Sequence, residues 1–223
     1  MRFFILLCYL IVHIVGLNAQ DHKYTQYHFT GATEKLLEYE AILGSPYYYE
    51  EFNDGDVFFL ENDTSVKYRL NYNAYTDAVE FLKDKKAFTV INPYEIKKIF
   101  LNNDTIVYIN YYNQGSISKG FFIEIIDSQI SLYKRETVIY APAKGTSFQI
   151  SKNNSGKFVR LKTKYYISIL GCPAFLVQNK KNIVSKFSNN PVVIDYLKKG
   201  KINVHSENDL KKFAEYINHY RTR

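Results

Sequence analysis

Histidine is the first side chain to consider for metal or acid–base chemistry. Beyond the first twenty residues the chain has four, His22, His28, His205 and His219. None lies in a spacing such as H-E-x-x-H, and none is paired with a cysteine. The sequence therefore predicts no metal site. It also lacks a G-x-S-x-G elbow, a phosphate-binding loop and a dinucleotide fingerprint, so we expect no cofactor.

Cysteine and carboxylates are the remaining candidates for catalysis. Cys172 precedes a proline with no histidine near in sequence, so we expect a buried apolar side chain rather than a nucleophile. Carboxylates gather between residues 50 and 63 without the register of a calcium loop. They are Glu50, Glu51, Asp54, Asp56, Glu61 and Asp63. We expect no catalytic residues, and an envelope hydrolase that uses a carboxylate pair ranks third among our hypotheses.

Tyrosine is the compositional oddity, with 21 tyrosines, 16 phenylalanines and no tryptophan. The stretch YRLNYNAYTDAVEF, residues 68–81, alternates apolar and polar residues on both sides of a polar break, which predicts a β-hairpin. Tyr68, Tyr72 and Phe81 share the parity of the apolar positions and should be buried. Tyr75 lies in the turn and should be exposed. With Tyr47, Tyr48 and Tyr49 it forms our predicted binding surface.

The elements that must position these side chains are mainly strands. Short β-runs separated by turn residues recur from residue 56 to residue 178, and GFFIEIID and ISLYKRETVIY face each other across Ser128-Gln129. Residues 32–43 are ambiguous between helix and strand. We predict a mainly β fold, an antiparallel sandwich or open barrel with a C-terminal helical segment.

The C-terminal part changes to helical periodicity. Asn190 can cap a helix that starts at Pro191 and ends at Gly200, and Ser206 begins a capping box for a second helix. The second helix carries an apolar stripe at residues 210, 213, 214 and 217. A shorter helix is predicted at 181–187.

The N-terminus predicts export. Arg2 precedes an apolar run of about 13 residues, shorter than the roughly 20 of a membrane-spanning helix, and Ala19 ends a small-residue cleavage site. We divide the chain into a signal peptide (1–19), a segment of uncertain structure (20–46), a β-rich body (47–179, with a possible break within 141–157) and a basic helical tail (180–223). The mature protein should be periplasmic or secreted, without a transmembrane segment.

Charge separates the body from the tail. Residues 20–179 contain 18 basic and 18 acidic residues, whereas residues 180–223 contain 10 basic and four acidic ones. A solvated helix face explains most of this excess, so we predict no nucleic-acid partner. Weak contact of the tail with an anionic surface is the remaining functional interpretation.

Two segments carry a resemblance. GSPYYYEEFNDGDVFF and then YRLNYNAYTDAVEF, with a hairpin and helical tail further on, resemble a broad family of uncharacterised exported β-rich proteins of Gram-negative bacteria. Leu70-Asn71 stands where that family has an arginine. The resemblance covers most of residues 44–220 and implies export and a β-body with a helical tail. It implies no activity.

Two functional hypotheses follow. The first is a non-enzymatic binding or structural component of the cell envelope, whose partner is an envelope protein or a polymer. The alternative is a carrier of an apolar ligand, held in a cavity that the strands enclose.

Overall fold

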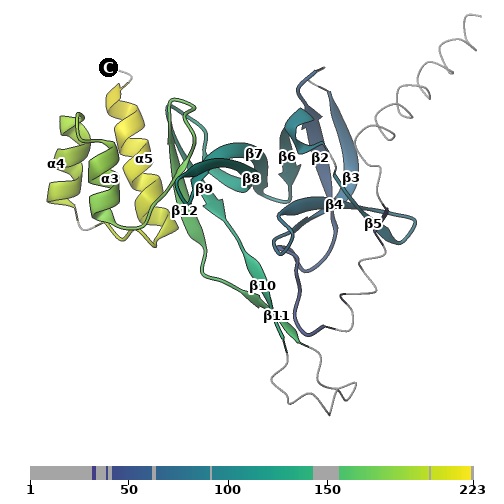
Figure 1. Cartoon of the computed structure of the whole chain (residues 1–223). Coiled ribbons are helices and arrows are strands. Elements are labelled where there is room, and N and C mark those ends of the chain that lie inside the picture. The colour runs from purple at the N-terminus through teal and green to yellow at the C-terminus, as the bar shows by residue number, and fades with distance from the viewer. Residues whose placement is uncertain are drawn as a thin grey trace, which may run out of the picture.

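The prediction of a mainly antiparallel β fold with a C-terminal helical segment is confirmed. The structure, a computed structural model, describes residues 32–33, 39, 42–61, 64–90, 92–142, 156–200 and 202–221. One 11-stranded sheet has the order β1-β5-β4-β3-β2-β6-β7-β8-β9-β12-β13, and β10 and β11 form a second sheet. The large sheet curls into an open half-barrel, with the helices at one end (Figure 1).

The elements have the following bounds. The strands are β1 (Ala32–Thr33), β2 (Asn53–Phe59), β3 (Ser65–Asn73), β4 (Ala78–Lys83), β5 (Lys86–Thr89), β6 (Ile96–Leu101), β7 (Asp104–Asn113), β8 (Ser116–Ile126), β9 (Ile130–Arg135), β10 (Val138–Ala141), β11 (Lys157–Arg160), β12 (Lys164–Ile169) and β13 (Phe175–Leu176). The helices are η1 (Pro93–Glu95), α3 (Lys180–Lys186), α4 (Pro191–Lys199) and α5 (Glu207–Arg221).

The predicted hairpin around residue 75 exists as β3 and β4. Its register pairs Leu70 with Phe81 and Asn73 with Ala78. Tyr72 and Phe81 are buried as expected, Tyr68 is half-buried, and Tyr75 in the turn is exposed. The hairpin prediction is therefore confirmed, although the opposite face of this hairpin is buried too.

The predicted hairpin of GFFIEIID and ISLYKRETVIY is confirmed only over its first part. β8 pairs with β9, but β9 ends at Arg135. After Glu136 and Thr137 the chain forms β10, which pairs with β11 and makes an arm that projects below the main sheet (Figure 1). The prediction of one continuous strand from residue 130 to residue 140 was therefore wrong, because the chain changes its pairing partner at residue 136.

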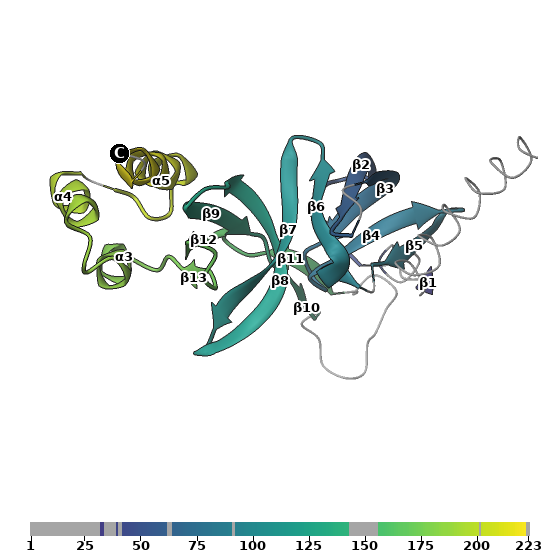
Figure 2. The same ribbon diagram turned by 90° about the horizontal axis from the view of Figure 1, so that it is seen from above.

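β7 changes partner along its length and so joins the two ends of the molecule. Its first three residues pair with β6, from Leu101 opposite Asp104 to Ile99 opposite Ile106. Further along, Ala174 accepts a hydrogen bond from the Tyr112 N–H and donates one to the Asn110 carbonyl. Viewed from above, β7 and β8 lie in the middle of the molecule, with the helices on one side and β2 and β6 on the other (Figure 2).

Three apolar clusters fill the interior. One fills the curl of β2, β3, β4, β6, β7 and β8. A second lies between β9, β12 and the three helices. The third packs rings of β7, β8, β9 and β12 on the other side of the sheet, with Tyr111, Phe122, Tyr133 and Tyr166 among its members. Burial of these side chains is the main stabilising contribution to the fold.

The helix predictions are confirmed by their caps. The Asn190 side chain accepts hydrogen bonds from the Val192 and Val193 N–H groups, and Gly200 ends α4. Ser206 Oγ accepts from the Asp209 N–H at the start of α5. These contacts are local, which is why spacing alone reveals them. Among the described helices, none combines the length and apolar character needed to cross a bilayer.

Several predictions fall outside the described residues. These are the signal peptide at 1–19, most of the segment 20–46 and residues 143–155 of the possible break. Of the ambiguous stretch 32–43, the structure gives Ala32–Thr33 as β1, paired with β5.

Candidate functional site

The four tyrosines of the predicted binding surface differ in exposure. Tyr75 is 44 % exposed, and its ring packs against Phe158 at 5.3 Å. Tyr48 and Tyr49 are half-buried. Tyr47 is only 6 % exposed, and its hydroxyl donates a 2.7 Å hydrogen bond to Glu80. The prediction that these side chains are exposed is therefore confirmed for Tyr75 and wrong for Tyr47, which is part of the interior.

Tyr49 is also held by the fold. Its hydroxyl donates to Asp104 Oδ2 at 2.7 Å and to the Leu101 carbonyl at 3.1 Å. Burial, and next the hydrogen bond to Asp104, raise the pKa of Tyr49, and burial with the charge of Glu80 likewise raises the pKa of Tyr47. Both phenols therefore remain protonated donors at neutral pH.

A buried polar network explains why both faces of the β3–β4 hairpin are covered. Asn71, Asn73 and Glu80 are buried on the same face. Asn73 Nδ2 and the Tyr47 hydroxyl donate to the two oxygens of Glu80. The Asn71 side chain accepts a hydrogen bond from the Tyr49 N–H and donates one to the Tyr49 carbonyl. Because each buried polar group has partners, the network ties residues 47–51 to the hairpin.

Asp77, in the turn of this hairpin, holds the two halves of the sheet together. Its Oδ2 accepts from Arg135 Nη2 at 2.6 Å, and its Oδ1 accepts from the Tyr72 hydroxyl at 2.8 Å. The Arg135 guanidinium also lies over the rings of Tyr111 and Phe122. Burial alone would lower the pKa of Arg135, but Asp77 together with Tyr111 and Tyr72 raises it overall. This ion pair is a structural contact between the β3–β4 turn and β9.

The described carboxylates between residues 50 and 63 lie at or near the surface. Glu50, Glu51, Asp54 and Glu61 are exposed, and Asp56 is half-exposed on β2. Asp63 and His28 lie outside the described residues. Among the described residues, no three histidine, cysteine or acidic side chains gather closely enough to hold a metal ion.

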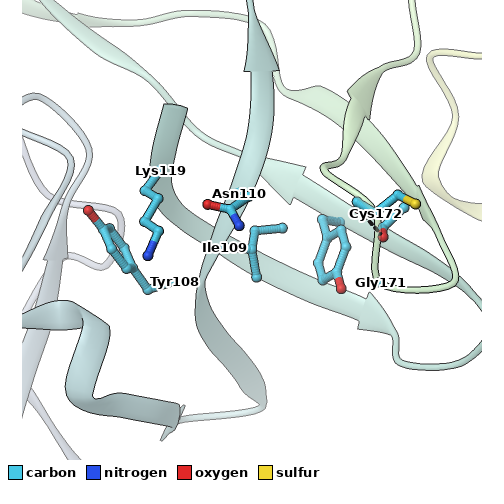
Figure 3. Close-up of a pocket in the computed structure, with 8 residues that line it drawn as sticks. Tyr108, Ile109, Asn110, Lys119, Gly171 and Cys172 are labelled. Carbon is cyan, nitrogen blue, oxygen red and sulfur yellow. Dashed lines mark hydrogen bonds between the residues drawn. The ribbon is translucent and has the colours of Figure 1, made fainter. Parts of the chain in front are cut away.

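A cleft of about 300 Å³ opens beside β7, near the point where that strand leaves β6 and meets Ala174 (Figure 3). On the edge of β7 away from β8, Tyr108 lies between the region paired with β6 and the bridge to Ala174; on the other edge it is opposite Phe121. Lys119 reaches the cleft from β8, and Gly171 and Cys172 come from the turn after β12. The lining residues are Tyr108, Ile109, Asn110, Lys119, Tyr133, Ser168, Gly171 and Cys172.

The turn that forms one wall of the cleft has an unusual backbone. Leu170 has a φ of 52° and Gly171 a φ of 74°, and the Cys172 N–H donates to the Ile169 carbonyl. The left-handed region is unfavourable for leucine, so the surrounding contacts hold this turn in place. Ser168 Oγ contributes, because it donates a 2.6 Å hydrogen bond to the Cys172 carbonyl.

Cys172 is exposed, so the expectation of a buried side chain was wrong. The reason is the tight turn, which places residues 170–172 at the surface. In Figure 3 its sulfur points away from the labelled side chains of β7. The thiol is therefore not aimed at the part of the cleft that a ligand beside Asn110 would occupy.

The cleft offers hydrogen-bonding groups and one positive charge. Among the lining residues that the structure describes, Lys119 is the only charged one. Burial, and next the charge of Asp77, raise the pKa of the Tyr108 hydroxyl, and burial raises the pKa of Tyr133. Both phenols are therefore neutral. Asn110 adds an amide that can donate and accept.

No residue pattern indicated this cleft. Tyr108, Asn110 and Lys119 are ordinary strand residues by pattern, and Ser168 and Cys172 lie about 50 residues further along the chain. Only the Leu170-Gly171-Cys172-Pro173 turn could have drawn attention to it.

Comparison with protein-family models, with curated proteins and with solved structures found no match in any of the three. The resemblance carried by residues 44–47 and 70–81 therefore stays a prediction. The site is interpreted from its own geometry.

Proposed function

We propose that this chain is an exported, non-enzymatic binding protein of the Gram-negative cell envelope. We further propose that it holds a small polar ligand with an acidic group, such as an acidic sugar, in the cleft beside β7. The lining of that cleft carries the proposal: two tyrosines, an amide and one ammonium group, with no carboxylate among the lining residues that the structure describes.

Binding, rather than catalysis, is supported by how the reactive groups are used. Ser168 Oγ donates to a backbone carbonyl instead of facing a base, and the Cys172 sulfur points away from β7. Nucleophilic catalysis needs a nucleophile within hydrogen-bond reach of a base. The described residues of the cleft lining include no such pair.

The ligand class follows from charge and hydrogen-bonding capacity. An ammonium group at Lys119 favours a carboxylate, since a charge-assisted hydrogen bond is stronger than a neutral one. The phenol of Tyr133 and the amide of Asn110 suit the hydroxyls of a sugar, whereas the Tyr108 hydroxyl points away from Asn110 (Figure 3) and Tyr108 offers its ring. The Tyr108 ring, half-buried against Phe121 at 4.9 Å, is fixed before a ligand arrives.

The packing of the curled sheet favours this function over the carrier alternative. A carrier needs open apolar space inside the strands. Here the inner face of the curl is occupied by close-packed side chains, among them the fully buried Leu70, Tyr72, Ile99 and Ile123.

The test is a titration of the exported protein, purified from the envelope fraction, with glucuronic acid and with glucose. We expect saturable binding of the acid and weaker binding of the neutral sugar. Lys119 is exposed, so its contact contributes about 1 kcal/mol, and Lys119→Gln should weaken acid binding about fivefold.

Lys83→Gln, which removes an equally exposed charge from β4, is the matched control and should leave binding unchanged. Equal affinity for both sugars, or an unchanged affinity in Lys119→Gln, would show that the cleft does not bind acidic ligands.

A further inference from the structure

One face of the β7–β8 hairpin continues from the cleft toward the tip of the hairpin. Lys119 and Asn110, which line the cleft, stand opposite each other in the register (Figure 3). The next pair on the same face is Ile117 opposite Tyr112, because alternate residues of a strand share a face. Both are exposed, Ile117 at 59 % and Tyr112 at 43 %. An accessible apolar pair therefore follows the polar end of the cleft.

β13 widens this face on the other side of β7. A parallel bridge joins Tyr111 to Ala174, and both belong to the third apolar cluster. The residues that follow them, Tyr112 and Phe175, therefore lie side by side on the opposite face. Phe175 agrees with this, since it packs in the second cluster, with the helices. The exposed ring of Tyr112 thus lies between Ile117 of β8 and Phe175 of β13.

Lys186 from α3 reaches over this row. Its Nζ lies 5.4 Å from the centre of the Tyr112 ring and 5.7 Å from that of the Phe175 ring. The last turn of a helix favours a cation, but the contact with two rings also fixes where this ammonium group lies. The side chain is still exposed. A second ammonium group therefore lies beside Tyr112, as Lys119 lies opposite Asn110.

The segments that build this face contain no acidic residue. Residues 105–123, which form nearly all of β7 and most of β8, have no aspartate or glutamate, and neither do residues 164–194, from β12 into α4. Among the described residues, neither Lys119 nor Lys186 forms an ion pair. Both ammonium groups are therefore available to an acidic ligand.

We propose that the site beside β7 takes a chain of acidic sugars, with one acidic unit at Lys119 and another at Lys186. This inference rests on the proposed function, because it extends the cleft described there for a single acidic sugar. Asn110 and Tyr112 are two residues apart, about 7 Å along the strand, so a ligand that contacts both lies along β7. The Tyr112 ring and Ile117 supply apolar contact for the sugar rings, and the Tyr112 hydroxyl supplies a hydrogen bond.

The test is isothermal titration calorimetry of the full exported protein with galacturonic acid, with its trimer and with the neutral trimer maltotriose. The acidic trimer should bind about fivefold more tightly than the monomer, which is the gain that one exposed ion contact can supply. Maltotriose should bind more weakly than the acidic trimer. A trimer also presents three acidic units to a single position, so variants must show that the gain comes from Lys186.

The variants separate the two ends of the site. Lys119→Gln should weaken the binding of monomer and trimer alike, whereas Lys186→Gln should weaken trimer binding about fivefold and leave monomer binding unchanged. Tyr112→Ser should act as Lys186→Gln does. The matched control is Lys181→Gln, which removes an exposed charge from the same helix, about 140° around its axis from Lys186, and should change neither affinity. Circular dichroism checks that each variant is folded.

The extended site and the cleft fail in different ways. If the trimer binds no more tightly than the monomer, or if Lys186→Gln leaves trimer binding unchanged, the extension is wrong and the cleft keeps its single acidic sugar. Equal binding of maltotriose and the acidic trimer would overturn the role of the two ammonium groups. If neither acidic ligand binds, the proposed function itself is refuted, and the extension with it.

Discussion

Replacing Gly120 with alanine should destabilise the protein, because β8 has no room for a methyl group where the Asp77–Arg135 ion pair crosses it. A Cβ at this position would lie 2.7 Å from Asp77 Oδ2, 3.2 Å from Arg135 Nη2 and 3.3 Å from Tyr111 Cε1. The backbone of Gly120 is outside the left-handed region, so alanine is strained only by these contacts.

Asp77 cannot move aside without losing its own contacts. Its Oδ2 lies 2.6 Å from Arg135, and its Oδ1 accepts from the Tyr72 hydroxyl at 2.8 Å and the Phe121 N–H at 3.3 Å. Hydrogen bonds to charged groups contribute about 1.5–3 kcal/mol each, at the low end here because both charged side chains are partly exposed. Alanine recovers about 0.4–1 kcal/mol by restricting the unfolded chain.

The net cost should therefore be about 1–2 kcal/mol, or roughly 2–8 °C in Tm for a chain of this length. Urea denaturation of Gly120→Ala, Asp77→Ala and the double variant measures it. Without the Asp77 carboxylate the nearest obstacle is gone, so Gly120→Ala should be neutral or slightly stabilising in that background. A coupling energy of about 1 kcal/mol or more is expected between the two sites.

The same loss in both backgrounds would refute the reasoning. It would mean that alanine at position 120 acts through something other than its contact with Asp77. A loss that disappears only in part would still assign the remainder to Tyr111 and Arg135, the next nearest groups.

Three further predictions test the polar contacts of the fold. Tyr47→Phe should lower the free energy of unfolding by about 1–3 kcal/mol, because it removes a partner of the fully buried Glu80, whereas Tyr75→Ser should cost less than about 1 kcal/mol; urea denaturation of the pair measures both. Burial, and next the charge of Asp127, raise the pKa of Glu124, so the folded state binds this proton more tightly and stability falls as pH rises through the folded-state pKa. Glu124→Gln should therefore raise Tm at neutral pH and change nothing below about pH 4, as a melting series in pH would show. Asn218→Ala should cost about 1–3 kcal/mol, because it leaves the backbone of β9 without two hydrogen bonds to α5; equal stability would contradict that anchoring role.

The parts of the fold that could be predicted are those with local causes. The β3–β4 hairpin follows from period-two alternation around a turn, and α4 and α5 follow from Asn190 and Ser206 at their first turns. In each case the residues that decide the element lie within a few positions of one another. A single sequence shows such spacing directly.

What could not be predicted depends on contacts between distant parts of the chain. Period two assigns Asn71 and Glu80 to a polar, solvent-facing side, but Tyr47 covers them from 33 residues before Glu80. Arg135 meets Asp77 across 58 residues. The cleft beside β7 arises because that strand pairs first with β6 and further along with Ala174. No residue pattern predicts such a change of pairing partner.

The contacts of the resembling motif indicate what that motif does. Asn71 bonds the backbone of residues 49–51, Asn73 and Glu80 bond each other, and Asp77 bonds Arg135. These polar side chains are all engaged in holding the hairpin, so they make a structural connection. The residues that would choose a ligand, such as Lys119, lie outside it. Chains that share the motif but differ at the cleft should therefore keep this fold and bind different ligands.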